Sequence, residues 1–133
     1  MNKISIAAIV MTFNEEIHLK RCLTSLKNVC DEIIIIDSFS NDSTKDIAKK
    51  YGTRFYQNKW INYSTQFNWA IENIQINSNW ILRIDADEYL SFQLAKDLSK
   101  LSGIDKGING ITINRLMYFM DKPLKYGGMY PIK

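Results

Sequence analysis

Short, continuous runs of hydrophobic residues alternate along the chain with longer segments in which hydrophobic residues recur every three or four positions. The continuous runs are typical of strands that are buried on both faces of a sheet. The last run differs, because Ile111 and Ile113 alternate there with polar residues. Five strands are predicted in total: residues 4–13, 33–36, 53–57, 79–84 and 110–119.

Four amphipathic segments lie between these strands, each with a hydrophobic stripe of helical spacing. In the first, Leu19, Cys22 and Leu26 share one stripe, so Cys22 is predicted to be a small core residue. Asn14 is predicted to cap this first helix and Ser91 the fourth, because both are good helix N-caps. The predicted helices cover residues 14–29, 43–51, 64–74 and 91–101.

The regular alternation of strand and helix predicts an α/β fold with a mainly parallel sheet and helices on both faces. Hydrophobic residues make up 46% of the chain and charged residues 23%, which is enough for a real core. A length of 133 residues fits one domain, so a single domain over residues 1–133 is predicted.

Composition excludes several classes of partner. The formal net charge is only +3, and no Lys/Arg block occurs, so no nucleic-acid partner is expected. One histidine rules out a His-rich metal site, and Cys22 and Cys30 lack the CxxC spacing of a zinc site. Free cysteines favour a reducing compartment, and residues 1–16 lack a signal-peptide cleavage site, so a cytoplasmic location is predicted.

Polar side chains gather where three of the predicted strands end. Ligands of parallel sheets bind beyond the carboxyl ends of the strands, so this coincidence predicts a binding site there. Close carboxylates repel one another, and the acidic end of the fourth strand therefore indicates a positive partner. The residues concerned are Thr12, Phe13, Asn14 and Glu15 after the first strand, Asp37 and Ser38 after the second, and Asp85, Ala86 and Asp87 after the fourth.

A nucleotide that carries its own metal satisfies these constraints. The turn after the first strand has no glycine, and Glu15 and Glu16 would repel a phosphate, so a dinucleotide-binding loop is excluded there. Asp37 still occupies the place where such folds put an acid for a ribose or base. Asp85 and Asp87 are predicted to hold Mg²⁺ or Mn²⁺, because hard cations bind one or two carboxylates together with substrate phosphates.

Four motifs, "TFNEE", "IIIIDSFSNDST", "QFNWAI" and "WILRIDADEYL", resemble in order and spacing the family 2 glycosyltransferases with the GT-A fold. The resemblance is to bacterial enzymes that build lipopolysaccharide core, O-antigen or capsule, including the β-1,4-glucosyltransferase-like group. It implies metal-dependent, inverting transfer of a hexose from a nucleotide-diphosphate sugar, usually UDP-linked, to a saccharide or lipid-linked acceptor.

The resemblance also implies roles for single residues. Asp37 would accept a hydrogen bond from the base, and Asp85 would approach the ribose or the metal. Asp87 would coordinate the metal that bridges the diphosphate, with Glu88 in support. The remaining residues implied in nucleotide binding are Thr12, Phe13, Glu15, Asn68 and Ala86.

Two features depart from the family pattern. Phe67 stands where relatives usually carry Arg or Lys; it fits the apolar stripe of its helix and is predicted to be core, with Lys59 or Arg83 as substitutes for the cation. The catalytic base of such enzymes lies well after the Asp-x-Asp motif, so it is expected beyond Lys133. The chain is therefore expected to be a domain whose acceptor-side C-terminal segment is incomplete.

Other interpretations of these features remain open. The chain can be a nucleotide-binding remnant without catalysis or, with less support because a Gly-rich basic loop is missing, a sugar nucleotidyltransferase. Trp60, Tyr63 and Trp69 can form a sugar-stacking wall, although packing is the simpler interpretation. Residues 116–120 can contact a membrane or partner if exposed, as can Lys96, Lys100 and Lys106, although a continued core strand and a solvated face are simpler.

Overall fold

The computed structural model describes residues 3–125 of the chain, which forms two compact units that divide after Gly103. The first unit contains four strands and four helices, and the second contains a short hairpin. The strands of the first unit are β1 (Ile6–Thr12), β2 (Glu32–Asp37), β3 (Arg54–Gln57) and β4 (Trp80–Asp85). Its helices are α1 (Leu19–Leu26), α2 (Thr44–Lys50), α3 (Tyr63–Asn73) and α4 (Phe92–Lys100).

The four strands of the first unit form one parallel sheet in the order β3-β2-β1-β4. This arrangement confirms the predicted α/β fold with a parallel sheet. The central strand β1 is buried along its whole length, because it has a hydrogen-bonded neighbour on each side and helices over both faces.

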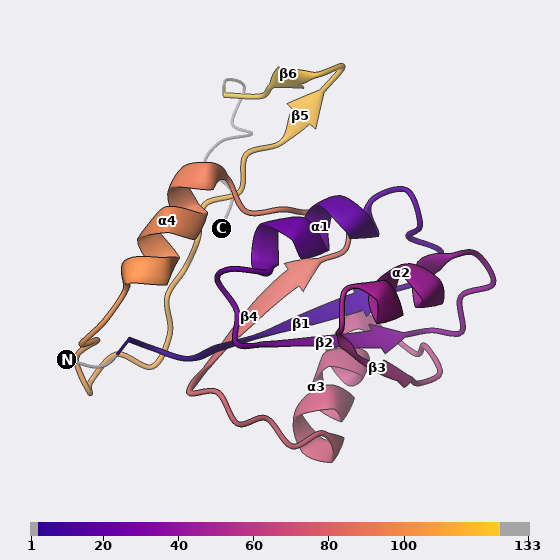
Figure 1. The fold of residues 1–133 in the computed structure, drawn as a ribbon, viewed down its shortest axis with the longest axis horizontal. Helices are drawn as coiled ribbons and strands as arrows, with labels where there is room; N and C mark the ends of the chain where they lie inside the picture. Colours follow the sequence, from indigo (N-terminus) through magenta and orange to yellow (C-terminus); the bar gives the residue numbers. More distant parts are fainter. Residues whose placement is uncertain (1–2, 126–133) are drawn as a thin grey trace. The chain divides into compact units, whose positions relative to one another are not determined.

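Alternate residues of β1 feed two hydrophobic clusters on opposite faces of the sheet. Ile6, Ala8 and Val10 pack with the stripe of α1 and with Ala48 of α2, while Ile9 packs on the other face with Ala70 of α3. Figure 1 shows α1 and α2 on one side of the sheet and α3 on the opposite side. The predicted helix layers on both faces are therefore confirmed.

Of the two predicted helix N-caps, the one at Ser91 is confirmed and the one at Asn14 is wrong. The Ser91 hydroxyl accepts a 3.1 Å hydrogen bond from the amide of Leu94 and caps α4 as expected. The prediction that Asn14 caps the first helix is wrong, because α1 begins only at Leu19, after a turn. Asn14 instead takes a left-handed conformation, with φ at 51°, and its side-chain oxygen accepts a bond from a neighbouring loop. A polar side chain that follows a strand can form a hydrogen bond with the backbone of a loop as readily as with the first turn of a helix.

The predicted fifth strand is wrong. Residues 110–117 form no strand, and the second unit holds only a two-stranded hairpin of β5 (Tyr118–Phe119) and β6 (Lys122–Pro123). Two alternating isoleucines offer little apolar area to hold a strand in a sheet, and Ile111 is half exposed. The core interpretation of residues 116–120 is also wrong within this unit, because all five side chains are exposed.

None of the helices in the part of the chain that the structure describes is both long enough and hydrophobic enough to cross a bilayer.

Candidate functional site

The order of the strands marks one crevice in the sheet. From β1 the chain moves through α1 to β2 on one side, and it later returns through α3 to β4 on the other side of β1. The helix α1 that connects β1 to β2 and the helix α3 that connects β3 to β4 lie on opposite faces of the sheet. Ligands of open α/β sheets bind at the carboxyl ends of the strands where the strand order reverses in this way. The site is therefore expected at the ends of β1 and β4.

Strand register brings the predicted site residues to this same edge. Thr12 pairs with Asp37 across β1 and β2, and Met11 pairs with Asp85 across β1 and β4. The structure therefore places the ends of three strands beside one another, as the sequence predicts. Asp37 continues the row to Gln57 at the end of β3.

Asp37 is completely buried, and protein groups engage both of its oxygens. Oδ1 accepts bonds from the hydroxyls of Thr12 at 2.7 Å and Ser40 at 2.5 Å, and Oδ2 accepts from the Ser40 amide at 2.8 Å. The Gln57 side chain adds a longer bond of 3.3 Å to Oδ2. Asp37 and the buried Thr12 thus fix the loop after β2, and the role of Asp37 toward a base stays a prediction.

The loops after β1 and β2 are joined by reciprocal hydrogen bonds. The Asn14 amide donates to the Ser40 hydroxyl at 2.8 Å, and the Asn14 side chain accepts from the Asn41 amide at 3.0 Å. The Glu15 amide donates to the Thr44 hydroxyl at 2.8 Å, while the Glu15 carboxylate contacts His18 at 3.2 Å. Bonds of this kind hold both loops in one arrangement.

Two aromatic side chains project from these joined loops. Phe13 is 61% exposed and Phe39 is 58% exposed, although large apolar side chains are normally covered. Phe39 has φ at 61°, a left-handed conformation that is costly for a bulky residue. Phe13 was predicted as a nucleoside-binding residue, whereas Phe39 was not, because its backbone conformation cannot be read from the sequence.

Helix α3 contributes a buried polar side chain to this region, and the predicted role of Asn68 toward a nucleotide stays a prediction. Gln66 is buried and donates to the Ser38 hydroxyl at 3.2 Å, so it connects α3 to the loop after β2. Gln66 also accepts a bond from Asn58 at 2.9 Å, which connects it to the loop after β3. Asn68 is exposed and has no such hydrogen bond within the described part of the chain. Phe67 packs against the core, as predicted.

The acidic loop after β4 has a fixed backbone. Its first turn closes when the Glu88 amide donates to the Asp85 carbonyl at 3.0 Å, and the Glu88 carboxylate accepts from the Asp85 amide at 3.0 Å. Further along, the Leu90 amide donates to the Ser25 hydroxyl of α1 at 3.0 Å. Ala86 is buried, whereas the Asp87 side chain is exposed. Among residues 3–125, nothing forms a hydrogen bond or ion pair with the Asp87 carboxylate.

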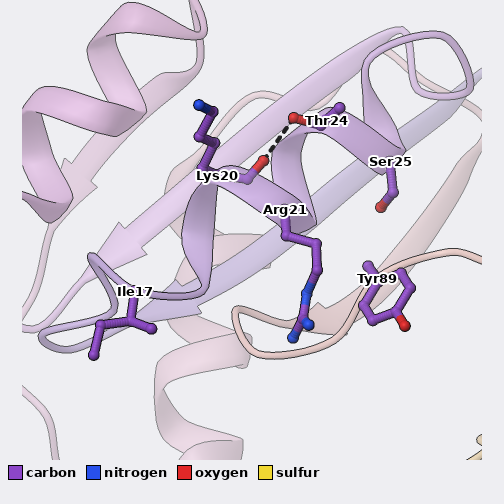
Figure 2. Close-up of a pocket in the computed structure, with 6 residues that line it drawn as sticks. All are labelled: Ile17, Lys20, Arg21, Thr24, Ser25 and Tyr89. Carbon is purple, nitrogen blue, oxygen red and sulfur yellow. Dashed lines mark hydrogen bonds between the residues drawn. The ribbon is translucent and has the colours of Figure 1, made fainter. Parts of the chain in front are cut away.

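Arg21 supports this acidic loop from α1. One of its terminal nitrogens lies 3.4 Å from the Asp87 carbonyl oxygen, and its guanidinium lies 4.4 Å from the centre of the Tyr89 ring. Figure 2 shows Arg21 extending from α1 toward the loop that carries Tyr89. An open pocket of about 460 Å³ lies here, lined by Ile17, Lys20, Arg21, Thr24, Ser25 and Tyr89. Arg21 holds the loop by its backbone and does not pair with the Asp87 carboxylate.

Tyr63 and Arg83 approach the same loop from the α3 side. The Tyr63 hydroxyl donates to Oδ1 of Asp85 and accepts a 3.0 Å bond from Nε of Arg83. The Arg83 guanidinium also lies 4.0 Å from the centre of the Tyr63 ring. Burial, together with the bond to Asp85, raises the pKa of Tyr63 above its ordinary value, so the hydroxyl keeps its proton. The predicted packing role of Tyr63 is confirmed, but its contact with Asp85 was missed, because nothing in the sequence pairs these two residues.

The cysteines add no ligand to this site. Burial, followed by the charge of Glu88 and Asp87, raises the pKa of Cys22 to about 12, and Cys22 is a core residue as predicted. A protonated thiol is neither a nucleophile nor a metal ligand at neutral pH. Burial likewise raises the pKa of Cys30 to about 12.

The donor chemistry at the β4 end fits a hard divalent cation. Asp85 and Asp87 offer carboxylate oxygens, which Mg²⁺ and Mn²⁺ prefer, whereas residues 3–125 contain no preformed group of three or more ligands from His, Cys, Asp and Glu. One or two protein carboxylates are typical of a cation that shares its coordination shell with substrate phosphates. Asp87 is the side chain best placed to hold it, because its carboxylate has no partner among the described residues.

Known proteins resemble this chain in sequence. Residues 7–123 match the sequence model of the family described as Glycosyl transferase family 2. A glycosyltransferase of Rickettsia conorii is 40% identical over 93 residues, which cover 70% of this chain and 32% of that protein. The lipopolysaccharide core biosynthesis glycosyltransferase LpsC of Rhizobium meliloti is 33% identical over 123 residues, which cover 89% of this chain and 44% of that protein. The chain therefore spans less than half the length of either relative.

Solved structures resemble it in fold. Residues 1–349 of TarS from S. aureus, in complex with UDP, superpose with a TM-score of 0.51 and 26% identity, covering 65% of this chain and 28% of that chain. Glucosyl-3-phosphoglycerate synthase from Mycobacterium tuberculosis, in complex with Mn²⁺, UDP and glucosyl-3-phosphoglycerate, superposes with a TM-score of 0.53 at 19% identity. The match covers 65% of this chain and 36% of that chain. Both matches support the GT-A fold predicted from the sequence.

Proposed function

Because the chain belongs to glycosyl transferase family 2, we propose that it forms the donor-binding part of a glycosyltransferase. The donor is a nucleotide-diphosphate sugar, a UDP-linked hexose. The acceptor is a saccharide or a lipid-linked saccharide of cell-surface polysaccharide biosynthesis. UDP in the complex with TarS and the lipopolysaccharide core role of LpsC support this choice of substrates. Nucleotide sugars are cytoplasmic metabolites, so the proposed location is the cytoplasm.

One observation carries the proposal: among residues 3–125 the Asp87 carboxylate has no partner, although the loop that carries it is held from two sides. Arg21 holds the loop through the Asp87 carbonyl, and Tyr63 holds it through Asp85. Asp87 lies two residues from Asp85 at the end of a buried strand, where two like charges repel each other and a bound cation would relieve the repulsion. An exposed carboxylate without a partner among residues 3–125, at the crevice between β1 and β4, is suited to a cation that enters with its ligand.

Each part of the edge then has a proposed task. Phe13 covers the base, and Thr12 and Asp37 hold the loops around it, with Glu15 on the same rim. Asp85 binds a ribose hydroxyl or the cation beside Ala86, and Asp87 is the main ligand of Mn²⁺ or Mg²⁺. Asn68 lies on the exposed side of α3. We propose that residues 1–133 belong to one donor-binding domain, as the sequence predicts, because the family match over residues 7–123 extends across both compact units.

The proposed reaction is an inverting displacement. A general base takes the proton of the acceptor hydroxyl, whose oxygen attacks the anomeric carbon from the face opposite the nucleotide diphosphate. A divalent cation held by Asp85 and Asp87 would supply positive charge against the charge of the departing diphosphate. Arg21 and Tyr63 keep the loop that carries these two acids in place.

Calorimetric titration with UDP, with and without Mn²⁺, tests the proposal. We expect micromolar binding that requires Mn²⁺ and weakens about a hundredfold or more in Asp87→Ala, because the main protein ligand of the cation is lost. Asp46→Ala is the matched control, since Asp46 is an exposed acid in the first turn of α2. Tight UDP binding that requires neither Mn²⁺ nor Asp87 would contradict the metal role. Absence of UDP binding by the wild-type chain would contradict donor binding.

A further inference from the structure

Asp85 offers its two carboxylate oxygens unequally. Oδ1 accepts the bond from the Tyr63 hydroxyl, while Oδ2 has no partner among residues 3–125. The Asp85 amide is also held, by the Glu88 carboxylate at 3.0 Å. Both the backbone and one oxygen of Asp85 are therefore fixed, and only Oδ2 is available to a ligand.

Arg83 would be the natural ion-pair partner of Asp85, because the two residues are two positions apart on β4 and point to the same face. The structure shows no salt bridge between them within the described range. Nε of Arg83 donates instead to the Tyr63 hydroxyl, and the guanidinium packs 4.0 Å from the ring centre. The Tyr63 hydroxyl thus lies between the Arg83 guanidinium and the Asp85 carboxylate.

We propose that Tyr63 is a positioning residue that presents Oδ2 of Asp85 to the nucleotide or its cation and keeps Arg83 from neutralising Asp85. The inference rests on the proposed function. It assigns Tyr63 a role beyond packing, and it makes Arg83 a group that Tyr63 holds aside. A hydroxyl suits both tasks, because it donates to the acid with its proton and accepts from the guanidinium with a lone pair.

A second Arg–Tyr pair lies in the same sheet, and its tyrosine does not keep the arginine away from a carboxylate. Arg54 donates to the Tyr56 hydroxyl at 3.0 Å, and its guanidinium lies 5.8 Å from the ring centre. There the arginine contacts the neighbouring carboxylate directly, with Nη1 of Arg54 2.8 Å from Glu32. Tyr56→Phe therefore removes a comparable bond far from the proposed site and serves as the matched control.

The experiment compares Tyr63→Phe, Arg83→Gln, the double variant and Tyr56→Phe by calorimetric titration with UDP in the presence of Mn²⁺. Electron paramagnetic resonance of bound Mn²⁺ reports the metal environment, and thermal unfolding without ligand reports the fold. We expect Tyr63→Phe to bind about tenfold more weakly, because a hydrogen bond to a charged group is lost and Arg83 becomes free to pair with Asp85. The double variant is expected to recover part of this loss, and Tyr56→Phe to bind like the wild type.

The outcomes separate the inference from the function on which it rests. If the wild type binds UDP, and Tyr63→Phe has the same affinity and the same Mn²⁺ resonance spectrum, the positioning role alone is overturned. A double variant that binds as weakly as Tyr63→Phe overturns the role given to Arg83. Equal weakening in Tyr56→Phe overturns the inference as well, because it would show a general loss of stability. Absence of binding by the wild type overturns the proposed function, and the inference with it.

Discussion

The two edges of the parallel sheet treat their carboxylates in opposite ways. Glu32 opens β2 at the amino edge, where its oxygens accept bonds from Arg54 at 2.8 Å, the Ser78 hydroxyl at 2.7 Å and the Asn77 amide at 2.9 Å. Asp87 follows β4 at the carboxyl edge, and among residues 3–125 its carboxylate has no partner. Protein groups surround the Glu32 carboxylate, whereas the Asp87 carboxylate is open to solvent or a ligand.

This difference teaches how to separate structural acids from ligand-binding acids. A carboxylate enclosed by donors contributes to folding, because those hydrogen bonds and ion pairs form only in the native state. An exposed carboxylate on a rigid loop contributes nothing comparable, and beside a second acid it is suited to the proposed cation. Variants of each acid should therefore affect stability and binding in opposite proportions.

Asp37 offers the strongest way to break this comparison, because it lies at the carboxyl edge and yet is enclosed. If the partners of an acid decide its role, Asp37→Ala should lower the free energy of unfolding by about 3 kcal/mol, since the buried Thr12 hydroxyl and the part-buried donors of Ser40 lose their acceptor. Urea unfolding followed by circular dichroism measures the change. Asp46→Ala, an exposed acid, should shift it by no more than about 0.5 kcal/mol.

Retained stability in Asp37→Ala would mean that the joined loops are held without this carboxylate. The edge of the sheet would then predict the role of an acid better than its partners do. The comparison between Glu32 and Asp87 would have to be restated in terms of position alone.

Glu32 supplies a smaller effect at the amino edge. The bond from Ser78, with those from Asn77 and the charge of Arg54, holds the pKa of Glu32 below its ordinary value. A lowered native pKa adds stability that is present above the unfolded pKa of about 4.3 and is lost as pH falls through the native value. We expect Glu32→Gln to lose about 1–2 kcal/mol of unfolding free energy at neutral pH.

The pH dependence provides the check on this prediction. The free energy of unfolding of the wild type should fall more steeply than that of Glu32→Gln as pH drops below about 4.3. UDP affinity in the presence of Mn²⁺ should be the same in both proteins, because Glu32 lies at the opposite edge from the proposed site. Parallel acid unfolding curves would show that Glu32 contributes nothing through its charge.

Much of the fold follows from the hydrophobic pattern. The continuous apolar runs predicted the buried strands β1 and β2, and the Leu19, Cys22 and Leu26 stripe is buried as predicted. The pattern failed where few apolar residues decided it: Ile111 and Ile113 alternate over too short a stretch to predict a strand. It also could not show that Ile71 of α3 is 44% exposed while the polar Gln66 beside the same stripe is buried.

The sequence predicted where the acids of the candidate site lie in the sheet, but not which groups contact them. Asp37, Asp85 and Asp87 could be found because they follow apolar strands, and parallel strands align their carboxyl ends. Which acid would be enclosed depended on side chains distant in sequence, such as Gln57 for Asp37 and Tyr63 for Asp85. Such contacts arise from tertiary packing, which no local pattern records.

The smallest expected effect on stability sharpens the comparison most. Asp87→Asn keeps the shape of the side chain and removes its charge from an exposed position beside Asp85 and Glu88. Since no described group pairs with this carboxylate, the free energy of unfolding should stay within about 0.5 kcal/mol of the wild-type value. Urea unfolding at neutral pH and low salt measures it, with Glu32→Gln as the destabilised reference. A loss as large as that of Glu32→Gln would place Asp87 among the structural acids, and its open position would then need no ligand to explain it.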